Sequence, residues 1–187
     1  MIRETIAGTG ELVIALLRPG AESSRAGSSV HEIACLGKIE SYEELEDGKY
    51  NIVVAGVYRV RIKREIQHSP YRLAEIEKIE YAGYEEHSTE ILQRHNHLGG
   101  LFARFTELAT GVRQQVLDLV PQLDFESLVN MVAMTLNLAI EQKQALLEIN
   151  EPAVRCDVLV PILQQQLETL LLVRRYEHIK PENPSLN

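Results

Sequence analysis

The spacing of hydrophobic residues along the chain changes near residue 84. Before that point, short runs rich in Val, Ile, Leu and Tyr are separated by glycines, which is typical of β-strands joined by turns. After it, apolar residues recur at three- and four-residue intervals, as they do along one face of an α-helix. We therefore predict an α+β protein, in which a twisted, partly closed antiparallel β lobe over residues 1–84 packs on a helical bundle over residues 85–187.

The β lobe is expected to contain five strand-like runs. They cover residues 12–17, 31–40, 50–55, 57–63 and 72–81. The first run is apolar without alternation, so we expect it to be covered on both faces. Gly37 indicates a bulge or a close backbone approach, Asp47-Gly48 indicates a hairpin turn, and Gly56 interrupts the strand that follows.

Basic and apolar residues alternate strictly in the fourth of these runs. One predicted face carries Tyr58, Val60 and Ile62, and the other carries Arg59, Arg61 and Lys63. The basic face is a candidate partner-binding surface for acidic or carboxylate-bearing segments. A solvated strand face is the plainer interpretation, and Arg59 could instead hold the hairpin through charge-assisted hydrogen bonds.

The second half of the chain carries glycine, proline and capping signals typical of helices. Gly99-Gly100 interrupts an apolar stripe, which indicates either a close neighbour or a bend. Asp124 suits an N-cap, Pro152 suits the first turn of the last helix, and Pro161 is expected to kink or split that helix. The apolar stripe, interpreted as core rather than as a partner groove, comprises Ile91, Leu98, Leu101, Phe105 and Leu108.

Charge and composition restrict the classes of partner. The chain has 27 acidic and 19 basic residues, a net charge of −8, 5% aromatic residues and no Trp. Such a surface repels phosphate backbones and offers few rings for stacking, so nucleic-acid binding is not expected. Cys35 and Cys156 lie far apart among apolar residues, which favours buried, reduced thiols. No secretory signal and no apolar run of about 18 residues is visible, so we expect a cytoplasmic protein that does not span a membrane.

Catalytic and metal-binding patterns fail on spacing. His31 and Cys35 would lie about 13 Å apart on a strand, which is too far for a catalytic dyad. His95 and His97 are two residues apart on a predicted helix, so they face different directions. No G-x-x-x-x-G-K-[ST] loop is present in the sequence to hold nucleotide phosphates. The sequence therefore predicts no catalytic residue, no cofactor and no metal ion.

Four stretches share their order and spacing with a known family. They are HEIACLGKIES (31–41), LEDGKYNIVVAGVYRVRI (45–62), SPYRLAEIEKIE (69–80) and KQALLEINEPAVRCDVL (143–159). Through them the chain resembles the N-terminal domain of ATP-dependent Lon proteases and the stand-alone bacterial proteins built on it. The marks of the family, to which we assign mainly structural roles, are Asp47, Gly48, Gly56, Arg59, Pro70, Tyr71, Gln144, Leu147, Glu148 and Arg155.

The resemblance implies a PUA-like β lobe and non-catalytic binding of unfolded or exposed polypeptide segments, in cooperation with a separate protease or chaperone. The ATPase and Ser–Lys peptidase domains of Lon have no counterpart in this sequence, so we expect no enzyme activity. Met1 falls just after the place where the family's first apolar strand would end, and a missing strand would leave a β edge open to another chain or to a homo-oligomer. Two other functions stay open: a small hydrolase or metabolite-binding protein, and an RNA-binding PUA-like module.

Overall fold

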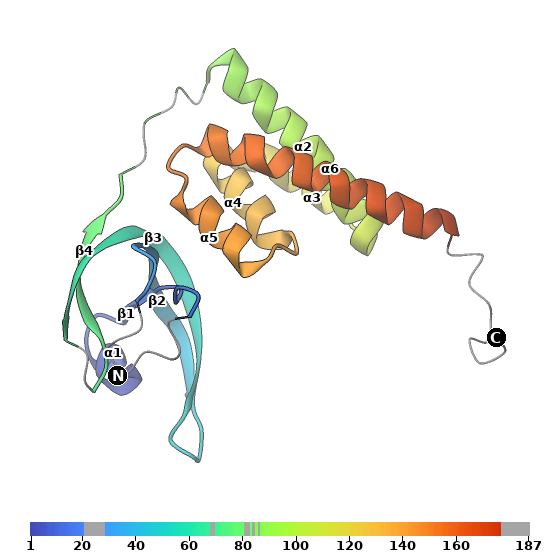
Figure 1. The fold of residues 1–187 in the computed structure, drawn as a ribbon. Helices are drawn as coiled ribbons and strands as arrows, with labels where there is room; N and C mark the ends of the chain where they lie inside the picture. The colour runs from blue at the N-terminus through green and yellow to red at the C-terminus, as the bar shows by residue number, and fades with distance from the viewer. Residues whose placement is uncertain (21–28, 68–69, 81–82, 84, 86, 177–187) are drawn as a thin grey trace. The chain divides into compact units, whose positions relative to one another are not determined.

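The computed structural model describes residues 1–20, 29–67, 70–80, 83, 85 and 87–176. They form two compact units, Met1–Tyr81 and Ala82–Asn187, the first containing an antiparallel sheet and the second helices (Figure 1). The predicted α+β class is therefore confirmed. The predicted boundary at residue 84 and the final residues 177–187 of the predicted helical lobe lie outside the described residues.

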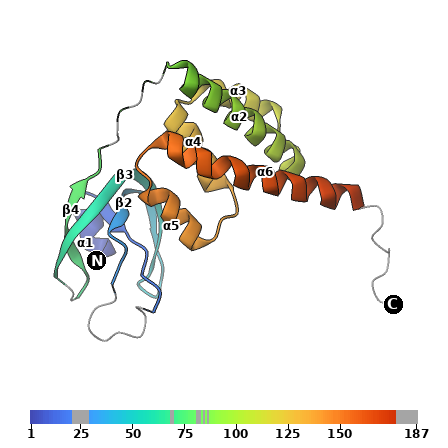
Figure 2. The same ribbon diagram turned by 45° about the horizontal axis from the view of Figure 1, so that its top comes forward.

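The sheet of the first unit has four antiparallel strands in the order β1-β2-β3-β4. The strands are β1 (Glu11–Ile14), β2 (Ile33–Glu44), β3 (Tyr50–Gln67) and β4 (Leu73–Lys78). The sheet curls strongly along β3, as Figures 1 and 2 show, but its described strands do not close into a barrel, so β1 and β4 are both edges. A short helix that we did not predict, α1 (Ile2–Ala7), precedes β1.

β1 differs from the strand that its apolar run predicted. It spans four residues and pairs only with β2 among the described strands. The Ile14 side chain is 54% exposed. The prediction that this run is covered on both faces is therefore wrong, because an edge position leaves one face of a short strand open to solvent.

Gly37 and Gly56 lie opposite each other, at a bulge between β2 and β3. The register shifts there, with Leu36 opposite Tyr58 and Gly37 opposite Gly56, so Val57 is the extra residue. A Cβ atom on Gly37 would lie 2.4 Å from a Val54 methyl group, which confirms the predicted close approach. Gly56 does not end the strand: the two predicted runs, 50–55 and 57–63, are parts of the single strand β3.

The turn between β2 and β3 is formed at the predicted Asp47-Gly48 site. Gly48 has a φ of 75°, which glycine adopts without steric cost. The Leu45 N–H donates to the Lys49 carbonyl at 2.8 Å and closes the hairpin. The hairpin prediction is confirmed.

The second unit is built from five α-helices and a 3-10 turn among the described residues. They are α2 (Thr89–Thr110), α3 (Gln114–Leu119), η2 (Val120–Gln122), α4 (Phe125–Thr135), α5 (Ile140–Glu148) and α6 (Pro152–Tyr176). Its core is apolar and includes Ile91, Leu98, Phe102, Phe125, Leu128, Val129, Val132, Leu136, Leu159 and Leu163. The predicted apolar stripe lies on α2 and contributes to this core, since Leu101 and Phe105 pack against the same cluster.

The helix ends follow their capping residues. Asp124 accepts a hydrogen bond from the Ser127 N–H at 2.6 Å and begins α4, as predicted. Pro152 begins α6, also as predicted. However, α6 continues through Pro161, so of the two predicted effects the split is wrong, and the kink stays a prediction.

α6 is also long and apolar enough, by length and composition alone, to cross a membrane. The sequence-based statement that no such segment exists therefore needs correction. Core helices pass the same test, and Cys156, Leu159 and Leu163 of α6 pack in the apolar cluster of the helical unit.

Candidate functional site

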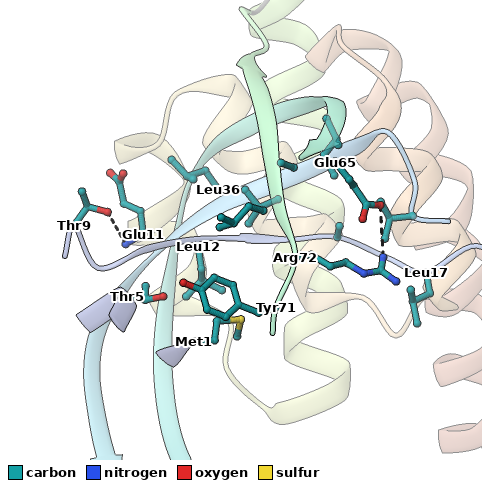
Figure 3. A pocket seen from close by; sticks show the side chains of 16 residues that line it. Met1, Thr5, Thr9, Glu11, Leu12, Leu17, Leu36, Glu65, Tyr71 and Arg72 are labelled. Atoms are coloured by element: carbon teal, nitrogen blue, oxygen red, sulfur yellow. Dashed lines mark hydrogen bonds and ion pairs between the residues drawn. The ribbon is translucent and has the colours of Figure 1, made fainter. Parts of the chain in front are cut away.

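A groove of about 690 Å³ lies within the β unit and receives side chains from α1, all four strands and the segment before β4. We call it the edge groove, because both edge strands contribute to its lining (Figure 3). Its lining residues are Met1, Thr5, Thr9, Glu11, Leu12, Val13, Ala15, Leu17, Val30, Leu36, Ile62, Glu65, Tyr71, Arg72, Leu73 and Ala74. Most of these side chains are aliphatic, so the groove suits an apolar ligand with few polar anchors.

The charged groups of the edge groove are few. Arg72 forms an ion pair with Glu65 at 3.7 Å, and Figure 3 shows the guanidinium directed toward that carboxylate. Glu11 is the remaining charged side chain of the lining. The α-ammonium group of Met1, another lining residue, balances the second carboxylate, so the lining carries no net charge.

The backbone of β1 presents hydrogen-bonding groups to the edge groove. The Ile39 N–H donates to the Gly10 carbonyl at 2.8 Å, so this carbonyl faces β2, while the Gly10 N–H donates to the Thr5 carbonyl at 2.9 Å. Because backbone groups alternate in direction along an antiparallel strand, those of Glu11 and Val13 face away from β2. The Glu11 N–H indeed donates to the Thr9 hydroxyl, at 3.3 Å, rather than to β2.

The same alternation holds on β4. The Ile79 N–H donates to the Arg59 carbonyl at 3.0 Å, so Ile79 and, two residues earlier, Glu77 face β3. The backbone groups of Ala74 and Ile76 therefore face the free edge. The edge groove is thus bordered by two strands that each direct backbone donors and acceptors away from the sheet.

The predicted basic face divides in the structure. Arg59 is only 5% exposed, so the expectation that it lines an exposed stripe is wrong. It lies opposite Cys35 of β2. Arg61 and Lys63 are exposed. Each is matched by a carboxylate, Arg61 by Glu32 at 3.4 Å and Lys63 by Glu77.

These ion pairs change the electrostatics of that face. The hydrogen bond from Lys63 lowers the pKa of Glu77 below the ordinary glutamate value. Because both cations already have acidic neighbours, the face presents little uncompensated positive charge. A partner-binding role for Arg61 and Lys63 stays a prediction.

The β-lobe residues that carry the family resemblance lie at turns and bulges. Asp47 accepts a hydrogen bond from the Lys49 N–H at 3.2 Å and pairs with the Lys49 ammonium within the hairpin turn. A Cβ atom on Gly56 would lie 3.7 Å from the sulfur of Cys35. Pro70 and Tyr71 lie just before β4, and Tyr71 lines the edge groove.

The helical residues of the resemblance are partly buried polar groups. Gln144 is buried and donates to Glu148 at 2.9 Å, one turn along α5. Arg155 is buried, donates to the Asn130 side chain of α4, and lies 3.8 Å from Glu126. Leu147 is partly buried. These contacts provide a physical basis for the structural roles that we assign to these residues.

The two cysteines lie outside the edge groove. Burial raises the pKa of the Cys156 thiol to about 11 and also raises the pKa of the half-buried Cys35. Both shifts favour the unreactive thiol form over the thiolate. Within the described part of the chain, no cluster of three or more His, Cys, Asp or Glu residues could hold a metal ion.

Sequence reasoning missed the edge groove. Its lining is drawn from residues 1 to 74, and most members are ordinary aliphatic residues. The one local signal was the short apolar run after residue 11, which resembles a covered strand. That this strand lies at an edge depends on the pairing of the whole sheet.

A family model described as the ATP-dependent protease La (LON) substrate-binding domain matches residues 1–165. The chain belongs to the Lon substrate-binding domain family. Among its curated relatives, Lon protease 1 of Bdellovibrio bacteriovorus is 30% identical over 146 residues, which is 78% of this chain and 18% of that protein. Lon protease of Syntrophomonas wolfei is 22% identical over 175 residues, which is 93% of this chain and 21% of that protein. The chain therefore spans about a fifth of the length of these relatives.

Two solved structures share the fold of this Lon-family chain. The Lon N-terminal domain protein from Xanthomonas campestris superposes with a TM-score of 0.59 at 17% identity, covering 86% of this chain and 80% of that one. The N-terminal domain of Mycobacterium avium complex Lon protease gives a TM-score of 0.60 at 19% identity, covering 82% and 90%. The resemblance inferred from the four sequence stretches is confirmed.

Proposed function

We propose that this chain is a non-catalytic module that binds extended, apolar segments of unfolded polypeptides. The observation that carries the proposal is the edge groove, whose aliphatic lining is bordered by two strand edges. Unfolded proteins expose both apolar side chains and unsatisfied backbone groups, and this groove complements both. The match to a substrate-binding domain supports the same conclusion, because the relatives that carry this domain are named as proteases.

The proposal places the chain in the cytoplasm, delivering bound segments to a separate protease or chaperone. Its own groups support binding rather than cleavage. The raised pKa values of Cys35 and Cys156 disfavour a nucleophilic thiolate. The lining of the edge groove contains no histidine or cysteine.

The test is a titration of a fluorescently labelled, permanently unfolded protein with the purified chain. We expect saturable binding in the micromolar range, and no cleavage products on a gel after prolonged incubation. The natively folded form of the same labelled protein is the control and should bind far more weakly. Absence of saturation at high micromolar concentration would count against the proposal.

A further inference from the structure

We infer that the polypeptide bound by this chain lies in the edge groove as an added β-strand, hydrogen-bonded on one side to β1 and on the other to β4. This inference rests on the proposed function and specifies its site and geometry. The occupant is an extended segment of another, unfolded polypeptide. Its chemistry follows from the backbone groups, the lining and the strand directions of the β unit.

The backbone groups on both sides of the groove select an extended chain. The N–H and C=O groups of Val13 point away from β2, and those of Ala74 and Ile76 point away from β3, by the alternation established above. A strand offers donors and acceptors along both of its sides, whereas a helix satisfies its own. An added strand is therefore the polypeptide conformation that matches the free edges of β1 and β4.

The lining selects the side chains of that strand. Among the described residues, the cluster in the sheet has three buried members, Ala34, Leu36 and Val60, with Val13 and Ile76 among the partly buried residues around it. Because side chains alternate across a strand, one face of an added segment would cover these aliphatic groups while the other faced solvent. The segment is thus expected to alternate apolar and polar residues.

The lengths of the two edges set the length of the bound segment. β1 spans four residues and β4 spans six, so about four to six residues of the segment can be paired. The net charge of −8 on the chain favours basic residues at the ends of the segment over acidic ones.

Strand direction gives a sharper expectation. In the order β1-β2-β3-β4 every neighbouring pair is antiparallel, so β1 and β4 run in opposite directions. A single added strand must then be antiparallel to one edge and parallel to the other. Because antiparallel pairing is slightly more stable and β4 is the longer edge, we expect the segment to run antiparallel to β4. Its N-terminus would then lie beside Lys78.

The experiment uses the full chain and a synthetic peptide of about eight residues that alternates valine and threonine between terminal lysines. Ala15→Trp and Ala74→Trp fill the groove from its two edges, since both alanines line it. The matched control is Val53→Trp, which adds the same ring at an exposed aliphatic position of β3 that is outside the lining and outside both edge strands. We expect each groove variant to weaken peptide binding by at least about tenfold and the control to bind as the unmodified chain does.

A second measurement needs no variant, so misfolding of a tryptophan variant leaves the inference testable. Peptide binding should slow hydrogen exchange at the amides of Val13 and Ile76, and a spin label at the peptide N-terminus should broaden the signals of Lys78 rather than Leu73. Equal peptide affinity of Ala15→Trp and Val53→Trp, or unchanged exchange at both edges, would overturn the inference.

The outcomes separate this inference from the proposed function. If the chain binds unfolded protein and the groove variants bind it equally well, the groove assignment fails and the proposed function stands. If the peptide binds in the groove but unfolded protein does not bind, the groove assignment stands and the proposed function fails. If neither binds, both fail. Dimerisation of the unmodified chain that is abolished by Ala15→Trp would instead identify a second copy as the occupant and overturn the inference.

Discussion

Gly99 and Gly100 are adjacent in α2, yet only Gly99 contacts another element. A Cβ atom on Gly99 would lie 2.5 Å from a methyl group of Val120, whereas a Cβ on Gly100 would meet nothing within 4 Å. The close neighbour that the glycine pair predicted is therefore Val120, and it lies against Gly99 alone of the two. At Gly100 the absence of a side chain has no packing reason in the structure.

Substituting each glycine by alanine should change stability in opposite directions. Gly100→Ala is expected to raise the free energy of unfolding by about 0.5–1 kcal/mol, because alanine costs less backbone entropy in a helix. Gly99→Ala gains the same propensity but overpacks against a stiff, branched valine, which costs about 1–3 kcal/mol. Denaturant unfolding followed by helical circular dichroism measures both, and stabilisation by both variants would show that Val120 yields freely.

The Lys63–Glu77 pair between β3 and β4 gives a prediction in pH. Its hydrogen bond lowers the folded-state pKa of Glu77, so the pair stabilises the fold above the unfolded-state pKa of a glutamate, and that contribution is lost as the pH falls through the lowered value. Lys63→Met should raise the Glu77 pKa toward its ordinary value in an NMR titration. Lys49→Met, which removes the partner of Asp47 in the distant hairpin turn, is the control and should leave Glu77 unchanged.

At the scale of elements, α6 shows tertiary packing overriding a local signal. Pro161 lies inside this helix and lacks the N–H that would donate to the Asp157 carbonyl one turn earlier. Leu159 and Leu163, on either side of it, are fully buried in the core of the helical unit. Burial of these leucines offsets the local cost of the proline, so the helix continues.

Pro161→Ala should therefore stabilise the helical unit. Pro161 is exposed, so alanine removes no core contact and restores a backbone hydrogen bond. The gain of up to about 3 kcal/mol in helix propensity is partly offset by about 0.4–1 kcal/mol from the freer unfolded chain. Calorimetry should show a higher melting temperature, while the control Glu168→Ala, also exposed on α6, should change it little. A lower melting temperature for Pro161→Ala would show that the proline ring contributes packing.

At the scale of the whole molecule, the net charge of −8 bears on the choice of partner. Long-range electrostatics act on association between any two charged chains and are screened within about 10 Å at moderate salt. An acidic binding module attracts basic unfolded polypeptides and repels acidic ones. The net charge thus favours basic polypeptides among those whose apolar side chains fit the edge groove.

The dependence of binding on salt checks this selection. A basic unfolded protein should bind more weakly as the salt concentration rises, because its attraction to the chain is screened. The same protein with its lysines succinylated should bind more weakly at low salt and gain affinity as salt is added. Titrations of both forms at low and high salt measure the effect, and identical salt responses would contradict it.

Much of the local structure was determined by the sequence by itself. The hairpin at Asp47-Gly48, the bulge at Gly37, the cap at Asp124 and the start of α6 at Pro152 follow from short-range chemistry: positive φ, a missing Cβ, a side-chain acceptor and a fixed φ. Such features depend on a few neighbouring residues. The family resemblance rests partly on the same residues, since Gly37, Asp47, Gly48 and Pro152 lie in its four stretches, which is why it also could be read without the fold.

Only the tertiary structure decided which strands lie at the edges of the sheet and which side chains are covered. The alternation of Arg59 and Arg61 placed them on one face, and both pair with β2, yet Arg59 is buried and Arg61 is exposed. The apolar run of β1 predicted a covered strand, yet the edge position of β1 exposes Ile14. The same position makes the strand β1 one border of the edge groove. Burial and pairing depend on residues far apart in the chain, and a periodic pattern carries no information on how those residues meet.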